Sequence, residues 1–298
     1  LFACPGAETV EDLQTCIICE NQAGAVELFT QQNGESFQAV VSETSSPIQS
    51  FVDTASVGDK LLILSGNSID HALMAFGALY AGIPFCPVSP AYSLVSRDYG
   101  KLAYLMKLLT PGLVFADDAA KFSDALTANV APGTEIAASR GAVAGRDITS
   151  LASLMATPLH ARLDATHEAI GPDTIAKFLL TSGSTGNPKA VINTQRMICA
   201  NQVLLRETLA FLKDEPPVIV DWLPWNHTFG GNHNIGLTLF NGGSMYLDEG
   251  KPMPGGIEET VRNLQEISPT VYFNVPKGYE SLLPYLRARG IRRIDRLI

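Results

Sequence analysis

Short apolar runs alternate with helix-like periodicity over residues 60–116. Compact runs of apolar residues are typical of buried strands, whereas apolar positions that recur every three or four residues predict helices. The predicted strands are Lys60–Leu64, Ile83–Val88 and Leu113–Ala116, and the predicted helices are Ile69–Ala81, with Gly82 at its C-cap, and Leu102–Leu109. Strands that alternate with helices predict an α/β fold with mixed, largely parallel sheets flanked by helices.

One uncharged stretch is long enough to cross a bilayer. Ala72–Ser96 contains no Asp, Glu, Lys or Arg. However, Pro84, Pro87 and Pro90 lie within it, and each proline removes a backbone donor. We therefore expect a helix, a buried strand and a proline-rich loop rather than a membrane span. Small and polar residues fill Thr127–Gly145, which we expect at the surface.

The composition predicts a folded chain that does not bind nucleic acid. Hydrophobic residues make up 46% of the 298 residues, which favours a substantial core over disorder. The net charge of −9 gives no general attraction to nucleic acid or to anionic membranes. Local groups can still bind small anions.

The five cysteines do not form a recognisable framework. Cys16 and Cys19 make a single C-x-x-C pair, which fits half of a zinc site or a redox pair. No second pair follows, so we interpret the cysteines as reduced thiols and expect a cytoplasmic protein.

The segment Thr181–Lys189, called here the phosphate loop, carries chemistry suited to an anion. Two strand-like runs, Ile175–Leu180 and Ala190–Thr194, lie on either side of it. Glycines allow backbone N–H groups to turn toward an anion, hydroxyls add donors, and a lysine adds a positive charge. The residues concerned are Thr181, Ser182, Gly183, Ser184, Thr185, Gly186 and Lys189.

Two other loop types do not fit this spacing. A P-loop has Gly-Lys followed by Ser or Thr and then a helix, whereas here Pro188 precedes Lys189 and a strand follows. A nucleophile elbow needs glycine two residues before the serine, where Ser184 has Ser182. A plain polar hairpin remains the alternative to a phosphate site.

A second candidate region is residues 224–234, called here the histidine loop. It contains His227, Asn232 and His233. The two histidines could share a metal, although no carboxylate or cysteine lies at a supporting distance, and we predict no metal site. They could instead be surface residues, or they could line a binding pocket. Spacing alone leaves these alternatives open and favours the surface.

The phosphate loop, TSGSTGNPK, resembles the signature of the adenylate-forming enzymes, which include acyl-CoA synthetases. Further stretches resemble feruloyl-CoA synthetases and similar aryl-CoA ligases: Leu61–Leu102, Lys189–Ile198, DWLPWNHTFGGNHNIG (Asp221–Gly236) and TVYFNVPKGYE (Thr270–Glu280). The resemblance covers residues 60–284, so we expect an AMP-binding large-domain portion there, a poorly recognised segment over 1–59 and an atypical Arg-rich end over 285–298.

The resemblance implies a two-step reaction. A carboxylate attacks the α-phosphate of ATP, and the thiol of coenzyme A then displaces AMP from the acyl-adenylate. The phosphate loop, with Lys189 and Thr185, would stabilise charge on the pyrophosphate, and Mg²⁺ would bridge phosphate oxygens. His227 would line the acyl pocket beside Asn232 and His233, with Val275 and Pro276 opposite, although a plain turn is the alternative for Val275-Pro276.

The resemblance also implies parts that we do not find. They are an adenine-binding strand, an Asp for the ribose and a small C-terminal domain with a catalytic Lys. Because the chain begins with Leu1 and its resemblance ends near Pro284, we expect a missing start and a truncated or frame-shifted end. A fatty-acyl-CoA synthetase, a carrier-protein ligase, or a non-catalytic or unstable ATP- or acyl-binding fragment are the alternative functions.

Overall fold

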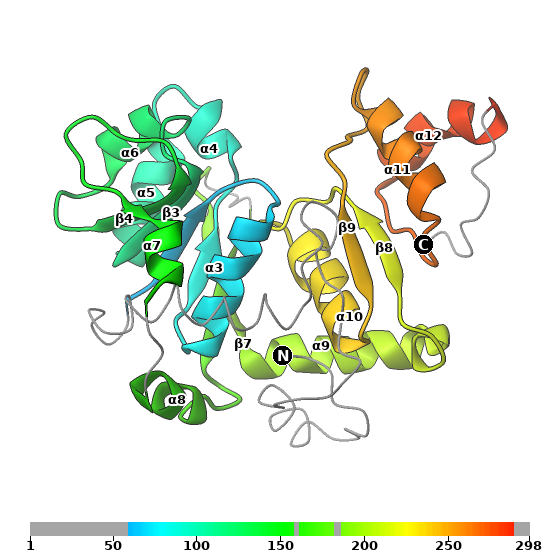
Figure 1. The fold of residues 1–298 in the computed structure, drawn as a ribbon, viewed down its shortest axis with the longest axis horizontal. Coiled ribbons are helices and arrows are strands. Elements are labelled where there is room, and N and C mark those ends of the chain that lie inside the picture. Colours follow the sequence, from blue (N-terminus) through cyan, green and yellow to red (C-terminus); the bar gives the residue numbers. More distant parts are fainter. Residues whose placement is uncertain (1–58, 158–160, 182–185, 289–298) are drawn as a thin grey trace. The chain divides into compact units, whose positions relative to one another are not determined.

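The computed structural model describes residues 59–157, 161–181 and 186–288. The described chain divides into two compact units: the first unit ends at Gln195, and the second unit begins at Arg196. Each unit has its own sheet and its own apolar core (Figure 1).

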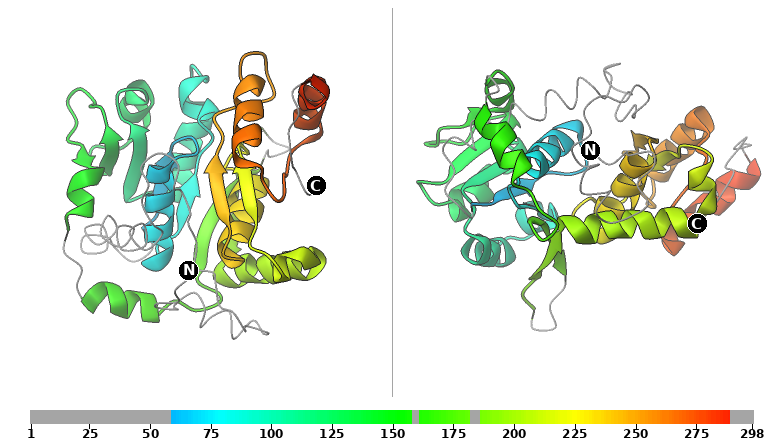
Figure 2. Two further views of the ribbon diagram at one scale, coloured as in Figure 1. Left: turned by 45° about the vertical axis from the view of Figure 1, so that its right-hand side comes forward. Right: turned by 90° about the horizontal axis from the view of Figure 1, so that it is seen from below.

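The first unit is built on a seven-stranded sheet with the order β5-β4-β3-β1-β2-β6-β7. Its strands are β1 (Leu61–Leu64), β2 (Phe85–Pro87), β3 (Leu113–Asp118), β4 (Glu135–Arg140), β5 (Thr149–Ser150), β6 (Ile175–Thr181) and β7 (Lys189–Thr194). Its helices are α3 (Ile69–Tyr80), α4 (Ala91–Leu94), α5 (Gly100–Leu109), α6 (Ser123–Asn129), α7 (Leu151–Met155) and α8 (Ala161–Glu168). Neighbouring strands are parallel except β6 and β7, which form an antiparallel hairpin (Figure 2). The predicted α/β fold is confirmed.

Strand β1 is paired on both sides, with β2 and with β3. No residue of Leu61–Leu64 is more than 1% exposed, which explains its unbroken apolar run. Helix α3 begins after Ser68, whose hydroxyl accepts a hydrogen bond from the N–H of His71 at 3.1 Å. It ends before Gly82, which has a φ of 66° and so adopts the left-handed conformation predicted for the C-cap.

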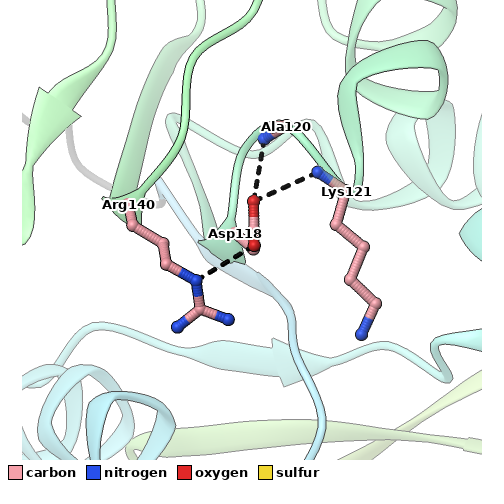
Figure 3. A network of polar contacts seen from close by, with 4 residues as sticks. All are labelled: Asp118, Ala120, Lys121 and Arg140. Carbon is pink, nitrogen blue, oxygen red and sulfur yellow. Dashed lines mark hydrogen bonds and ion pairs between the residues drawn. The ribbon is translucent and has the colours of Figure 1, made fainter.

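Asp118 connects the C-terminal ends of β3 and β4 (Figure 3). Its Oδ1 accepts hydrogen bonds from the N–H groups of Ala120 and Lys121, both at 3.1 Å. Its Oδ2 accepts from the Nε of Arg140 at 3.0 Å. The hydrogen bond from Lys121 is the main cause that lowers the pKa of this carboxyl. The network closes the turn after β3, so we assign it a structural role.

The second unit contains a two-stranded parallel sheet, β8 (Val218–Asp221) and β9 (Ser244–Leu247). Its helices are α9 (Gln195–Thr208), which begins at the boundary residue, the 3₁₀-helix η1 (Ala210–Lys213), the π-helix η2 (Phe229–Asn234), α10 (Ile235–Phe240), α11 (Ile257–Ile267) and α12 (Pro276–Ala288). Val220 of β8 packs with Val261 and Leu264 of α11 and with Leu282 of α12. A second cluster joins Ile219 to residues of η1 and α10.

Most predicted elements are confirmed, with one error. The uncharged stretch 72–96 divides into most of α3, β2 and α4. Among the described residues, none of the helices combines the length and the hydropathy that a membrane crossing requires. The prediction that 127–145 lies at the surface is wrong for β4, which runs through it and includes Ile136 at 1% exposed, whereas residues 131–133 and 140–142 are exposed as expected.

Some predictions fall on residues that the structure does not describe. The pair Cys16 and Cys19 and the rest of 1–58 lie outside the described residues, as do residues 289–298 of the Arg-rich end. The described cysteines, Cys86 and Cys199, are both buried free thiols.

Candidate functional site

The phosphate loop connects the two strands of the β6–β7 hairpin. The register pairs Thr181 directly with Lys189, and both residues are exposed. Directly paired residues of antiparallel strands share one face, so the hairpin places a hydroxyl and an ammonium group together at the base of the loop. Gly186 has a φ of 87°, a conformation that glycine adopts without strain.

The centre of the phosphate loop is not described. Ser182, Gly183, Ser184 and Thr185 lie outside the described residues, so their predicted contacts with phosphate stay predictions. The structure describes the two strands that border this loop. They pair in a defined register, and Lys189 lies where the second strand begins.

Two of the basic side chains that are buried in the first unit have strongly lowered pKa values, Lys177 of β6 and His71 of α3. Lys177 of β6 is 5% exposed, and its Nζ lies 5.7 Å from the centre of the Phe85 ring. Burial lowers the pKa of Lys177 to about 7. Burial also lowers the pKa of His71 to about 4, although its Nδ1 lies 3.0 Å from the carbonyl oxygen of Gly66. The interior of this unit therefore favours neutral bases.

The histidine loop belongs to the second unit, where it follows β8 and continues into the π-helix η2. A Cβ on Gly230 would clash with the carbonyl oxygens of Leu223 and Pro224, and a Cβ on Gly231 with that of Trp225. The start of the loop thus packs directly against the π-helix backbone, which only glycine permits. π-Helical segments are often found at functional sites.

His227 lies at the exposed part of the histidine loop. Its Nδ1 accepts a hydrogen bond from the N–H of Phe229 at 3.3 Å. Because Nδ1 is an acceptor here, the neutral ring carries its proton on Nε2. His227 therefore presents a donor at its outer nitrogen.

His233 has a different environment. The half-buried ring lies edge-on to Phe229, with 5.2 Å between ring centres, and to Phe273, with 4.7 Å. Its Nδ1 lies 2.7 Å from the Oδ1 of Asn234. Burial lowers the pKa of His233 and thereby favours the neutral ring.

Asn234 and Asp221 form a buried pair next to His233. Asn234 is 0% exposed, and its Nδ2 donates to the Oδ1 of Asp221 at 2.9 Å. The N–H of Leu223 donates to the same oxygen at 3.1 Å. Burial is the main cause that raises the pKa of Asp221 to about 7, against the hydrogen bonds from Leu223 and Asn234, which lower it. Sequence reasoning missed both residues, although an Asp directly after the apolar run Val218–Val220 is a usable signal.

Asn232 is held from two sides. Its carbonyl oxygen accepts a hydrogen bond from the Nε2 of Gln202 at 3.0 Å, and its Nδ2 donates to the hydroxyl of Thr228 at 3.4 Å. Gln202 belongs to α9 and is fully buried, and a Cβ on Gly236 would clash with it. Helix α9 therefore supports the histidine loop, a role that the sequence did not suggest.

Val275 lies directly before α12, and Pro276 is the first residue of that helix. Val275 is half-buried, with its N–H donating to the Oδ1 of Asn274 at 2.8 Å, and Pro276 is exposed. Since Phe273 contacts the ring of His233, this segment lies beside the histidine loop. Thr181, Gly186 and Lys189 belong to the first unit, and His227, Asn232, His233, Val275 and Pro276 to the second unit.

Over residues 59–157, 161–181 and 186–288, no group of three or more His, Cys, Asp or Glu side chains could hold a metal ion. The hypothesis that His227 and His233 share a metal therefore has no support from the described residues.

Comparisons with known proteins give a consistent picture. The family model described as AMP-binding enzyme matches residues 52–294. A methyl-dioxo-octahydro-indenyl-propanoyl:CoA ligase of Rhodococcus jostii is 25% identical over 201 residues, which cover 63% of this chain and 37% of that protein. The medium-chain-fatty-acid–acyl-carrier-protein ligase TtuA of Teredinibacter turnerae is 39% identical over 76 residues, or 26% of this chain and 12% of TtuA.

Solved structures share the fold. The crystal structure of ATP-bound MatB from Rhodopseudomonas palustris superimposes with a TM-score of 0.71 at 23% identity, covering 91% of this chain and 50% of that chain. The chain thus spans half of MatB and smaller shares of the two relatives.

Proposed function

Because the chain belongs to the AMP-binding enzyme family, we propose that it activates a carboxylic acid as an acyl-adenylate for transfer to coenzyme A. A carboxylate oxygen attacks the α-phosphorus of ATP, the bond to the bridging oxygen breaks, and pyrophosphate leaves. The thiol sulfur of coenzyme A then attacks the acyl carbon, AMP leaves, and the thiol proton passes to solvent.

The observation that carries this proposal is the β6–β7 hairpin. Thr181 and Lys189 pair at its end and are exposed, so a hydroxyl and an ammonium group are available to phosphate oxygens. A carboxylate is already a nucleophile at neutral pH, so the first step depends on stabilising charge on the leaving pyrophosphate. We assign that role to Lys189 and Thr185, with the Ser182, Gly183, Ser184 and Gly186 positions supplying further donors.

The histidine loop is our candidate for the acid-binding region. The exposed His227 carries its proton on Nε2 and can donate a hydrogen bond to a carboxylate oxygen. Phe229, His233 and Phe273 meet edge to face beside it, an arrangement that suits an aromatic guest. We therefore propose an aromatic, hydroxycinnamate-like acid, in line with the resemblance to feruloyl-CoA synthetases, with Asn232, Val275 and Pro276 near its ring.

A second candidate is an aliphatic acid. The match to TtuA, a medium-chain-fatty-acid ligase by name, favours this class. The two candidates share the first step and differ only in the acid that binds.

Mg²⁺ and coenzyme A are assigned no protein ligands in the described chain. Since no described acidic cluster fits a metal ion, we expect Mg²⁺ to enter bound to the oxygens of ATP.

Acid-dependent exchange of labelled pyrophosphate into ATP tests the proposal, using this chain and the longest protein that contains it. We expect exchange with ferulate that exceeds exchange with octanoate. Higher exchange with octanoate would favour the aliphatic candidate. If neither protein supports exchange with any acid while ATP fails to bind by calorimetry, the proposed function is wrong.

A further inference from the structure

Three residues of the second unit form a chain of hydrogen bonds that ends at an open ring nitrogen. Asp221 lies at the C-terminal end of β8, and Asn234 and His233 lie at the end of the π-helix η2. The bonds run from Asn234 Nδ2 to Asp221 Oδ1 at 2.9 Å and between His233 Nδ1 and Asn234 Oδ1 at 2.7 Å. Asp221 and Asn234 are at most 1% exposed.

The direction of these bonds follows from Asp221. Its Oδ1 already accepts the N–H of Leu223 at 3.1 Å, so this oxygen is an acceptor toward Asn234 as well. Only the amide nitrogen of Asn234 can donate to it, which turns the amide oxygen toward His233. An amide oxygen cannot donate, so His233 must supply the proton from Nδ1.

Protonation of Asp221 does not reverse this order. Its other oxygen, Oδ2, is buried and has no hydrogen-bond partner within the described chain, so a proton on that oxygen leaves Oδ1 free to accept. The side chains of Phe229 and Phe273 hold the plane of the His233 ring from two sides, so the ring cannot easily turn its other edge toward Asn234.

We propose that Asp221 and Asn234 hold His233 in the tautomer with its proton on Nδ1, so that its Nε2 accepts a hydrogen bond from the activated acid. Within the described chain, Nε2 of His233 makes no hydrogen bond, and the residue is only half-buried. The acid then carries a hydroxyl or N–H donor where it meets His233. This substrate class rests on the proposed function, whereas the tautomer does not.

The two histidines of the loop are thereby complementary. His227 accepts at Nδ1 and donates from Nε2, whereas His233 donates at Nδ1 and accepts at Nε2. A carboxylate, which only accepts, suits His227, and a hydroxyl at another position of the same acid suits His233. Asp221 and Asn234 act through His233 and are positioning residues.

The tautomer is measured by long-range ¹H–¹⁵N correlation NMR on the full chain labelled at its five histidines. His233→Gln identifies the His233 signals by their loss. We expect a protonated-type shift at Nδ1 and a lone-pair-type shift at Nε2 of His233, and the reverse pattern at His227. An Nε2-protonated His233 in the wild-type chain overturns the relay without any further variant.

Substitutions distinguish residues that position the His233 ring from residues that only stabilise the fold. Asn234→Ala should release His233 to the Nε2-protonated tautomer, whereas Asp221→Asn keeps an acceptor oxygen and should preserve the wild-type pattern. Asn241→Ala is the matched control, because that amide donates to the Leu237 carbonyl of α10 at 2.8 Å instead of contacting His233. An unchanged tautomer in a folded Asn234→Ala chain also counts against the relay.

The substrate class is tested with 4-hydroxycinnamate and 4-methylcinnamate, which match in shape and differ in the donor. We expect the hydroxyl acid to bind about tenfold more tightly and to move the Nε2 shift of His233, with the preference lost in His233→Phe. Equal affinities would overturn the substrate class. If neither acid binds, the proposed aromatic substrate and this class both fail, while the tautomer still decides the relay.

Discussion

The two units place opposite kinds of charge in their interiors. The buried residues of the first unit include the bases His71 and Lys177, beside a large sheet, whereas those of the second unit include the acid Asp221, at the end of a two-stranded sheet. Burial lowers the pKa of both bases and raises the pKa of the acid, so each unit favours the neutral form of its buried group. The side chains to which we assign a role in the reaction differ from these buried groups, because Lys189 and His227 are exposed to solvent.

Because these buried groups differ, the same change in pH should alter the stability of the two units in opposite directions. Between pH 4 and 6.5, unfolding of the first unit takes up a proton at His71, so its stability rises with pH. Over nearly the same range, the folded second unit retains a proton on Asp221 that the unfolded chain loses, so its stability falls with pH. The predictions below test this contrast.

The largest effect is expected at the exposed cation of the first unit. Lys189→Ala removes the charge that we assign to pyrophosphate and should lower acid-dependent ATP–pyrophosphate exchange about 10²–10³-fold. Lys107→Ala, an exposed lysine of α5, is the matched control. If the Lys189→Ala protein exchanged pyrophosphate at the wild-type rate, the catalytic role assigned to this exposed lysine would be wrong.

The next effect concerns the close packing of the second unit. Gly231→Ala places a methyl group against the carbonyl oxygen of Trp225 and should destabilise this unit by about 3 kcal/mol. Both tryptophans of the chain, Trp222 and Trp225, belong to this unit, so their fluorescence during urea unfolding reports on it. Gly133→Ala has open space around its Cβ and lies in the first unit, so this control should keep the wild-type midpoint of the tryptophan signal. Equal midpoints for the two variants would contradict the predicted clash.

Lys177→Met should stabilise the first unit by on the order of 2 kcal/mol at pH 6, because it removes a charge that burial disfavours. The folded pKa of about 7 lies below the usual 10.5, so wild-type stability rises with pH between these values. The advantage of the variant should therefore shrink toward pH 10.5. Hydrogen exchange of β6 peptides measures it, with Lys107→Met as control. A constant difference across this range would show that Lys177 does not titrate as expected.

The smallest expected effect is a change in stability that depends on pH in the opposite direction. Asp221→Asn keeps an acceptor oxygen and removes the ionisable group, and it should stabilise the second unit by about 1 kcal/mol at pH 8. The folded pKa of about 7 lies above the usual 3.8, so the wild-type carboxyl costs stability as pH rises from 3.8 through 7. Tryptophan fluorescence at pH 4 and pH 8 checks this. If the variant gains more at pH 4 than at pH 8, the contrast between the units is wrong.

The pattern of apolar residues was sufficient to predict those helices and strands of the first unit whose buried side chains are large. Leu61–Leu64 and Ile69–Tyr80 form the predicted strand and helix, and both are buried on all sides, which explains their dense runs of apolar residues. Strand β4 was missed because its buried residues include Ala137 and Ala138, whose small side chains give a weak apolar signal.

The candidate site was only partly predictable. The phosphate loop and the two histidines stand out locally, since glycines, hydroxyls and imidazoles lie close together in sequence. Asp221 and Asn234 are thirteen positions apart and meet only after the π-helix forms. Gln202, thirty positions from Asn232, supports the loop from another helix. Pairings over such separations are set by tertiary packing and leave no local pattern.

The register of the β6–β7 hairpin also limits which insertions and deletions the chain can accept. Because Thr181 faces Lys189 and Leu179 faces Val191, a single residue gained or lost within β7 must either form a bulge or shift the strand by one step. Such a shift would turn every side chain of β7 to the opposite face. Evolutionary change in this segment should therefore exchange one amino acid for another far more freely than it alters the number of residues.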